Sequence, residues 1–82
     1  MSTFHARCTE HKARNGRHYC EFVVESPGER PEEFSLQPSP LEYEELKEHS
    51  VDAEDGAKIG WVPVVDDDGW TVEWDALEAY TR

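Results

Sequence analysis

The tripeptide Arg14-Asn15-Gly16 constrains the fold most, because it lies between two segments in which apolar and polar residues alternate. Asn-Gly flanked by such segments is the strongest short-range signal for a β-hairpin, which we expect over residues 1–26. The pattern favours a three-residue loop that ends in a left-handed Gly16, because this register gathers the apolar side chains on one face. These side chains are Phe4, Ala6, Cys8, Cys20, Phe22 and Val24.

A capped helix is expected over residues 40–49. Ser39 takes the N-cap position, Pro40 the first helical position and Glu42 the third, and together they form a capping box. The preceding residues 27–39 are rich in proline and glutamate, which predicts an irregular surface connection.

A second hairpin is expected over residues 58–74, around the turn Asp66-Asp67-Asp68-Gly69. A four-residue loop is favoured, because it pairs Val65 with Trp70 and forms one large apolar face. That face holds Ile59, Trp61, Pro63, Val65, Trp70, Val72 and Trp74. Asp75 then begins a second capping box, which predicts a short helix over residues 75–82.

These elements predict an α+β fold, in which two hairpins form an antiparallel sheet and short helices complete the order ββαββα. The 82 residues suffice for a single domain, 1–82, with one modest core. The three tryptophans are expected in this core, because so small a domain needs large apolar rings inside. The alternative is an exposed platform on which bases or a sugar would stack.

The sequence contains no glycine-rich phosphate loop, nucleophile elbow or His-Glu-x-x-His motif. Its many carboxylates come without a pocket that would shift the pKa of one relative to its neighbour. The acidic turn does not fit a calcium-binding loop, because the first and twelfth ligand positions fall on Val64 and Asp75. We therefore expect a non-enzymatic protein with no catalytic residues and no cofactor.

Cys8, His11, His18 and Cys20 are the candidate zinc ligands. In the expected register both cysteines and His18 lie on the apolar face, whereas His11 lies on the opposite face with His5. Because this divides the ligand set, we expect free structural thiols and surface histidines. A zinc site and a single disulfide are the alternatives.

Acidic residues dominate the composition, with 19 Asp and Glu against 8 Lys and Arg and a formal net charge of -11. The charge is uneven, because residues 1–20 carry +3 and residues 21–82 carry -14. A nucleic-acid-binding protein needs Lys and Arg to neutralise phosphates, so we expect a basic protein partner and no direct nucleic-acid binding. The candidate partner-binding residues are Glu42, Glu44, Glu45, Glu48, Asp52, Glu54, Asp55, Asp66, Asp67 and Asp68.

In size, acidity and lack of catalytic motifs, the chain resembles small phage-encoded inhibitors, the DNA mimics and anti-CRISPR proteins. The resemblance covers the whole chain without a sequence motif, and it rests on these carboxylates together with Glu73, Asp75 and Glu78. It implies a protein that blocks a nuclease or CRISPR effector by occupying a basic, nucleic-acid-binding surface. Two alternatives stay open: a small zinc-binding interaction module, and a salt-adapted domain whose acidity serves solubility.

No run of the sequence approaches the roughly 20 apolar residues that span a bilayer. The first residues also lack the pattern of a signal peptide. We expect a cytoplasmic protein without membrane association, in the cytoplasm of the host cell if a phage encodes it.

Overall fold

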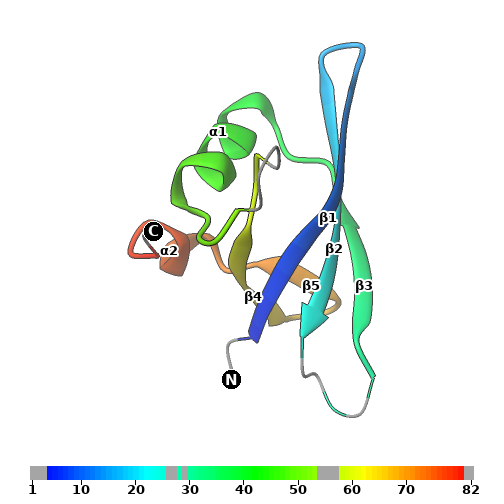
Figure 1. Cartoon of the computed structure of the whole chain (residues 1–82), viewed down its shortest axis with the longest axis vertical. Helices are drawn as coiled ribbons and strands as arrows, with labels where there is room; N and C mark the ends of the chain where they lie inside the picture. Colours follow the sequence, from blue (N-terminus) through cyan, green and yellow to red (C-terminus); the bar gives the residue numbers. More distant parts are fainter. Residues whose placement is uncertain (1–3, 26–27, 29, 54–57, 81–82) are drawn as a thin grey trace.

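A computed structural model describes residues 4–25, 28, 30–53 and 58–80 of the chain. Within them, five strands form one antiparallel sheet in the spatial order β3-β2-β1-β4-β5. The strands are β1 (Phe4–Arg14), β2 (Arg17–Glu25), β3 (Glu32–Leu36), β4 (Trp61–Asp66) and β5 (Trp70–Val72). Two helices, α1 (Pro40–His49) and α2 (Trp74–Leu77), lie beside one side of the sheet (Figure 1). The expected α+β class is confirmed.

The strand β3 corrects the expected order of elements, because residues 27–39 were predicted to be irregular. Glu32–Leu36 pairs with β2 and extends the sheet at its edge. Phe34 and Leu36 alternate with polar residues and pack against the core. Phe34 also stacks on Phe22 of β2, with ring centroids 5.3 Å apart. The order is therefore βββαββα, and the prolines on either side of β3 masked its short alternating pattern.

The first hairpin has a two-residue loop, so the predicted three-residue loop is wrong. Arg14 pairs with Arg17, and Asn15 and Gly16 both have positive φ, 53° and 75°, as a type I′ turn requires. The register shifts between Cys8 and Glu10. This shift is a β-bulge at Thr9, which inserts one extra residue into β1.

The bulge preserves the predicted apolar face near the core and changes the outer part of the hairpin. Ala6 still lies opposite Val24, and Cys8 lies opposite Phe22. Beyond Thr9 the alternation of β1 is inverted, so that His11 lies opposite Cys20.

The second hairpin also has a shorter loop than predicted. Asp66 pairs with Trp70 and Val64 pairs with Val72, whereas the sequence pattern favoured Val65 opposite Trp70. Because a shift of one residue exchanges the two faces of a strand, Val62 and Val64 enter the core and Trp61 turns to the other face. The left-handed residues Asp68 and Gly69, with φ of 54° and 108°, close this tighter turn.

The helix α1 has the predicted bounds and the predicted cap. The Ser39 hydroxyl accepts a hydrogen bond from the Glu42 N–H at 3.2 Å, and the Glu42 carboxylate accepts one from the Ser39 N–H at 2.9 Å. The helix α2 begins at Trp74 with Glu73 as N-cap and no side-chain cap hydrogen bond, so the predicted capping box at Asp75 is wrong. Residues 81–82 of the predicted helix lie outside the described residues.

The core lies between the sheet and the two helices. Its buried side chains are Ala6, Cys20, Phe22, Val24, Tyr43, Leu46, Ile59, Val62, Val64, Val72 and Leu77. Trp70 of β5 donates its indole N–H to the Glu32 carboxylate of β3. Because β3 and β5 are the two edges of the sheet, this contact shows that the sheet curls around the core.

Candidate interaction surface

The outward face of α1 carries most of the predicted acidic helix surface. Tyr43 and Leu46 point into the core, which leaves the positions between them facing solvent. Leu41 is 79% exposed. The other exposed side chains of this face are Glu44, Glu45 and Glu48. We call Leu41, Glu44, Glu45 and Glu48 the α1 face.

Two glutamates of α1 have partners within the chain. Glu42 is half-buried and serves the capping box. Glu44 forms an ion pair with Lys47, with 3.1 Å between Oε2 and Nζ. This ion pair offsets part of the repulsion among the helix carboxylates. Glu45 and Glu48, one turn apart, are the carboxylates of α1 most available to a partner.

The remaining predicted partner-binding residues fall into separate groups. Asp52 is exposed just after α1 and has a left-handed backbone, with φ of 53°. Asp66, Asp67 and Asp68 are exposed at the β4–β5 turn, which lies at the far end of β4 from α1 (Figure 1). The six residues of β4 are joined by five steps of about 3.3 Å each, so roughly 17 Å separates its two ends. Glu54 and Asp55 lie outside the described residues.

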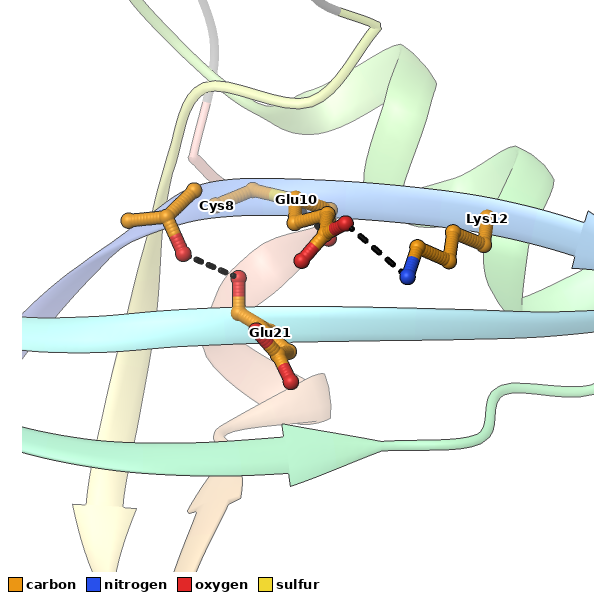
Figure 2. A network of polar contacts seen from close by, with 5 residues as sticks. Cys8, Glu10, Lys12 and Glu21 are labelled. Carbon is orange, nitrogen blue, oxygen red and sulfur yellow. Dashed lines mark hydrogen bonds and ion pairs between the residues drawn. The ribbon is translucent and has the colours of Figure 1, made fainter.

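Further carboxylates gather on the outer face of the sheet, where sequence reasoning did not place a site. Glu10 and Glu21 lie opposite each other across β1 and β2 (Figure 2). Glu21 and Glu33 line a hollow of about 290 Å³ between β2 and β3. The Thr9 hydroxyl donates to the Glu21 carbonyl at 3.4 Å, and Lys12 pairs with Glu10 at 3.1 Å. Recognising β3 would have revealed this group.

Basic residues occupy the tip of the first hairpin, which extends beyond the rest of the sheet (Figure 1). Lys12, Arg14 and Arg17 are all exposed there. Lys12 lies opposite Tyr19, and Arg14 lies opposite Arg17. The positive part of the sequence therefore forms a projecting arm, away from the exposed acids of α1.

The three tryptophans are all half-buried. They are therefore neither fully inside the core nor part of a fully exposed stacking platform, which were the two alternatives from the sequence. Trp70 and Trp74 pack against the core, and Trp70 meets Phe4 edge to face at 5.3 Å between ring centroids. Trp61 lines an open hollow of about 520 Å³ together with Tyr80. The Arg7 guanidinium lies 5.9 Å from the centroid of the Trp61 ring, so a cation of the chain itself already approaches this ring.

The four candidate zinc ligands lie on one face of the hairpin, contrary to the prediction that His11 would lie on the other. The bulge at Thr9 is the cause, because it turns His11 toward the side of Cys20 and His18. His11 Nε2 and His18 Nδ1 are 3.0 Å apart, so one ring N–H donates to the other ring. Both rings stack on Tyr43 of α1, with centroids 4.6 Å and 4.0 Å away.

The two cysteines lie on the same face of the hairpin as the histidines. Both are free thiols; Cys20 is fully buried and Cys8 is partly exposed. The Cys8 thiol donates to the Glu10 carbonyl at 3.5 Å. Among the described residues, no three His, Cys, Asp or Glu side chains are arranged to hold a metal ion.

The pKa values of the two thiols are shifted in opposite directions. A hydrogen bond from the Cys20 thiol lowers the pKa of Cys8, although burial opposes this effect. The same hydrogen bond, together with burial, raises the pKa of Cys20 strongly. Burial raises the pKa of Tyr43, and the positive charge of Lys47 partly opposes this effect. Cys8 is therefore the thiol of this pair that ionises first.

No helix in the described part of the chain is long and apolar enough to cross a membrane. The sequence matches no protein family, no curated protein and no solved structure. The surface, its charges and its side-chain contacts are therefore the basis on which a function is proposed.

Proposed function

We propose that the chain is a non-enzymatic inhibitor that binds a basic, nucleic-acid-binding surface of a nuclease or CRISPR effector. The α1 face makes the principal contact. The observation that carries this proposal is the exposure of Glu44, Glu45 and Glu48 on one side of a helix whose other side is anchored in the core. These residues are held on a rigid element, so their carboxylates are positioned before a partner arrives.

The spacing of these carboxylates suits a surface that normally binds phosphates. Residues three and four apart on a helix have Cβ atoms about 5–6 Å apart. A row of negative charges at such intervals attracts Lys and Arg side chains and accelerates association with a basic groove. Asp52 lies just beyond the C-terminal end of α1 and continues the negative charge.

Leu41 supplies the apolar contact that charge alone does not provide. Ion pairs between exposed side chains each contribute only about 0–1 kcal/mol, whereas the centres of stable interfaces are apolar with a polar rim. Leu41 and Glu45 are four residues apart and so are neighbours on the α1 face. A partner that covers Leu41 would bring its basic side chains against the surrounding glutamates.

The Asp66, Asp67 and Asp68 turn has a secondary role in this proposal. It lies at the far end of β4 from α1 (Figure 1). The length of that strand, roughly 17 Å, exceeds the distance of about 8 Å over which exposed charges act at physiological ionic strength. These aspartates therefore contribute to attraction at low salt, while the α1 face determines affinity in the bound complex.

Two triple variants with the same change in net charge test this arrangement. One replaces Glu44, Glu45 and Glu48 by Lys, and the other replaces Asp66, Asp67 and Asp68 by Lys. A basic partner is first captured from a cell lysate and purified, and its binding to each variant and to a DNA duplex is then measured. The wild-type chain should displace the duplex. The helix variant should bind at least about tenfold more weakly, and the turn variant should change little at physiological salt.

The result identifies which part of the proposal fails. Equal weakening by both variants would show that net charge matters and the α1 face does not. Wild-type affinity in both variants, or binding that leaves the DNA duplex in place, would contradict the inhibitor proposal altogether. Circular dichroism of each variant is required, so that loss of binding is not confused with loss of the fold.

A further inference from the structure

The strongest unassigned chemistry lies where the first hairpin meets α1. Cys8 and Cys20 come from neighbouring strands and are in hydrogen-bond contact. The bulge at Thr9 lies between them along the hairpin, and both side chains lie on the face that meets α1. Cys20 has no exposed surface, whereas Cys8 is partly exposed. One thiol of the pair is thus open to a small reagent, and the other is open only to its partner.

Tyr43 provides a second, independent observation at the same place. Tyr43 is only 5% exposed, and its buried hydroxyl has no hydrogen-bond partner among the residues that the structure describes. A buried hydroxyl without a partner is costly and calls for an explanation. The Tyr43 ring stacks on His11 and His18, and His11 lies directly opposite Cys20 across the hairpin, so the hydroxyl belongs to the same cluster as the thiols. It is therefore a donor available to an anion that forms or binds beside the thiols.

We propose that Cys8 and Cys20 are a peroxide-sensitive thiol pair, in which Cys8 is oxidised first and Cys20 then closes a disulfide within the chain. The proposal is independent of the inhibitor function, because none of its three side chains belongs to the α1 face. The class of reagent is a hydroperoxide, and hydrogen peroxide is the probe.

The reaction has two balanced steps. The Cys8 thiolate attacks one oxygen of hydrogen peroxide, so that an S–O bond forms, the O–O bond breaks and hydroxide leaves with the electron pair. The Cys20 thiol gives its proton to that hydroxide, and its sulfur attacks the Cys8 sulfur. The S–S bond forms, the S–O bond breaks, and the oxygen leaves as water after protonation. Two thiols and one peroxide thus become one disulfide and two waters.

Cys8, Cys20 and Tyr43 each have a separate role in this reaction, which follows from their positions. Ionisation favours Cys8, because the Cys20 thiol donates a hydrogen bond to its sulfur. Thiolate character and access together select the cysteine that peroxide oxidises. The Tyr43 hydroxyl supplies a donor to the negative oxygen that develops beside Cys8. Cys20 lies on the same face of the neighbouring strand, which makes it the thiol placed to close the disulfide.

The test measures the masses of the wild-type protein after treatment with hydrogen peroxide in buffer containing a metal chelator. We expect the intact mass to fall by about 2 Da, because two hydrogens leave when the disulfide forms. Peptide mapping should place the bridge between Cys8 and Cys20. The Cys20→Ala variant should instead accumulate a sulfenic acid at Cys8, which dimedone traps, and the Cys8→Ala variant should leave Cys20 unmodified.

A second measurement uses only the wild-type chain and so does not depend on whether the variants fold. Iodoacetamide should label Cys8 at least about tenfold faster than Cys20 in the folded protein, and the difference should vanish in concentrated urea. Faster labelling of Cys20, peroxide oxidation of Cys20 first, or disulfide-linked dimers would overturn the proposal. So would stoichiometric zinc in the purified protein that both cysteines are needed to hold.

Discussion

Gly60 is the residue at which a single methyl group should disturb this fold most specifically. It is buried, and a Cβ atom added there would lie 2.1 Å from the Val51 carbonyl oxygen and 2.6 Å from the Ala53 nitrogen. Both atoms belong to the backbone, so no side-chain rotation relieves the overlap. The chain after α1 must move away from the start of β4 if Gly60 becomes alanine.

The structure sets the size of this effect. The displaced segment carries two hydrogen bonds, from the Val51 N–H to the Trp61 carbonyl at 3.1 Å and from the Trp61 N–H to the Val51 carbonyl at 2.7 Å. Each such bond contributes about 0.5–1.5 kcal/mol. Alanine also restricts the unfolded chain, which returns about 0.4–1 kcal/mol. With the remaining steric strain, the free energy of unfolding should fall by about 2 kcal/mol, which lowers Tm by roughly 10 °C.

Urea denaturation followed by tryptophan fluorescence measures this change. Hydrogen exchange supplies the local readout, because the amides of Val51 and Trp61 should lose protection. Gly69→Ala is the comparison: a Cβ there meets nothing within 4 Å, but its φ of 108° strains any other residue. That variant should lose stability without exposing the two amides. A Gly60→Ala protein as stable as the wild type, with both amides protected, would refute the reasoning.

Three further predictions concern the cap, the histidines and the salt dependence. Ser39→Ala should lower the free energy of unfolding by about 1 kcal/mol in urea titrations, with Ser39→Asp retaining it; no difference between the two variants would count against the cap. Burial, followed by the charges of His18 and Lys58, lowers the pKa of His11, so the unfolded chain binds this proton more readily. The stability that neutral His11 contributes should therefore be complete above about pH 6.5 and be lost as pH falls through the folded pKa. The urea midpoint should drop less on acidification in His11→Gln, and an equal drop would contradict this assignment. Finally, circular dichroism should show the fold in dilute buffer, and a chain that folds only in molar salt would favour the salt-adapted alternative.

The sequence predicts best those features whose signals are local. The bounds of α1 follow from Ser39, Pro40 and Glu42 alone, because a helix cap is completed within four residues. The position of the first turn at Asn15-Gly16 is equally local, although its predicted three-residue length was wrong. The strand β3 was missed because its stability comes from β2 and the core, and five residues beside prolines carry a weak signal of their own.

Register was the harder problem in both hairpins. In each hairpin the sequence pattern favoured the loop length that would give the largest continuous apolar face. In the first hairpin the chain instead combines a two-residue turn with a bulge, and in the second it buries valines and leaves Trp61 half-exposed. A large ring such as Trp61 can bury much of its apolar surface while it stays partly exposed to solvent. The number of aromatic residues on one face of a strand is therefore a poor guide to register.

The candidate surface was predictable to the extent that it lies on α1. The exposure of Glu45 and Glu48 follows from helical periodicity. The carboxylates on the outer face of the sheet required knowledge of β3, and the meeting of His11 with His18 required knowledge of the bulge. Such contacts depend on how strands pair across the sheet, which one strand's sequence does not contain.

The bulge at Thr9 also determines where this protein tolerates a change in length. Residues on either side of Thr9 keep their partners if it is deleted, because Cys8 and Glu10 already face consecutive residues of β2. Removing a residue from the Asn15-Gly16 turn is not tolerated in this way, because it would shift the register by one residue and exchange the two faces of β2. Thr9 deletion should therefore leave an 81-residue chain with the same core. Because bulges increase local twist, that shortened sheet should be flatter, and the contact between Trp70 and Glu32 at its edges should loosen.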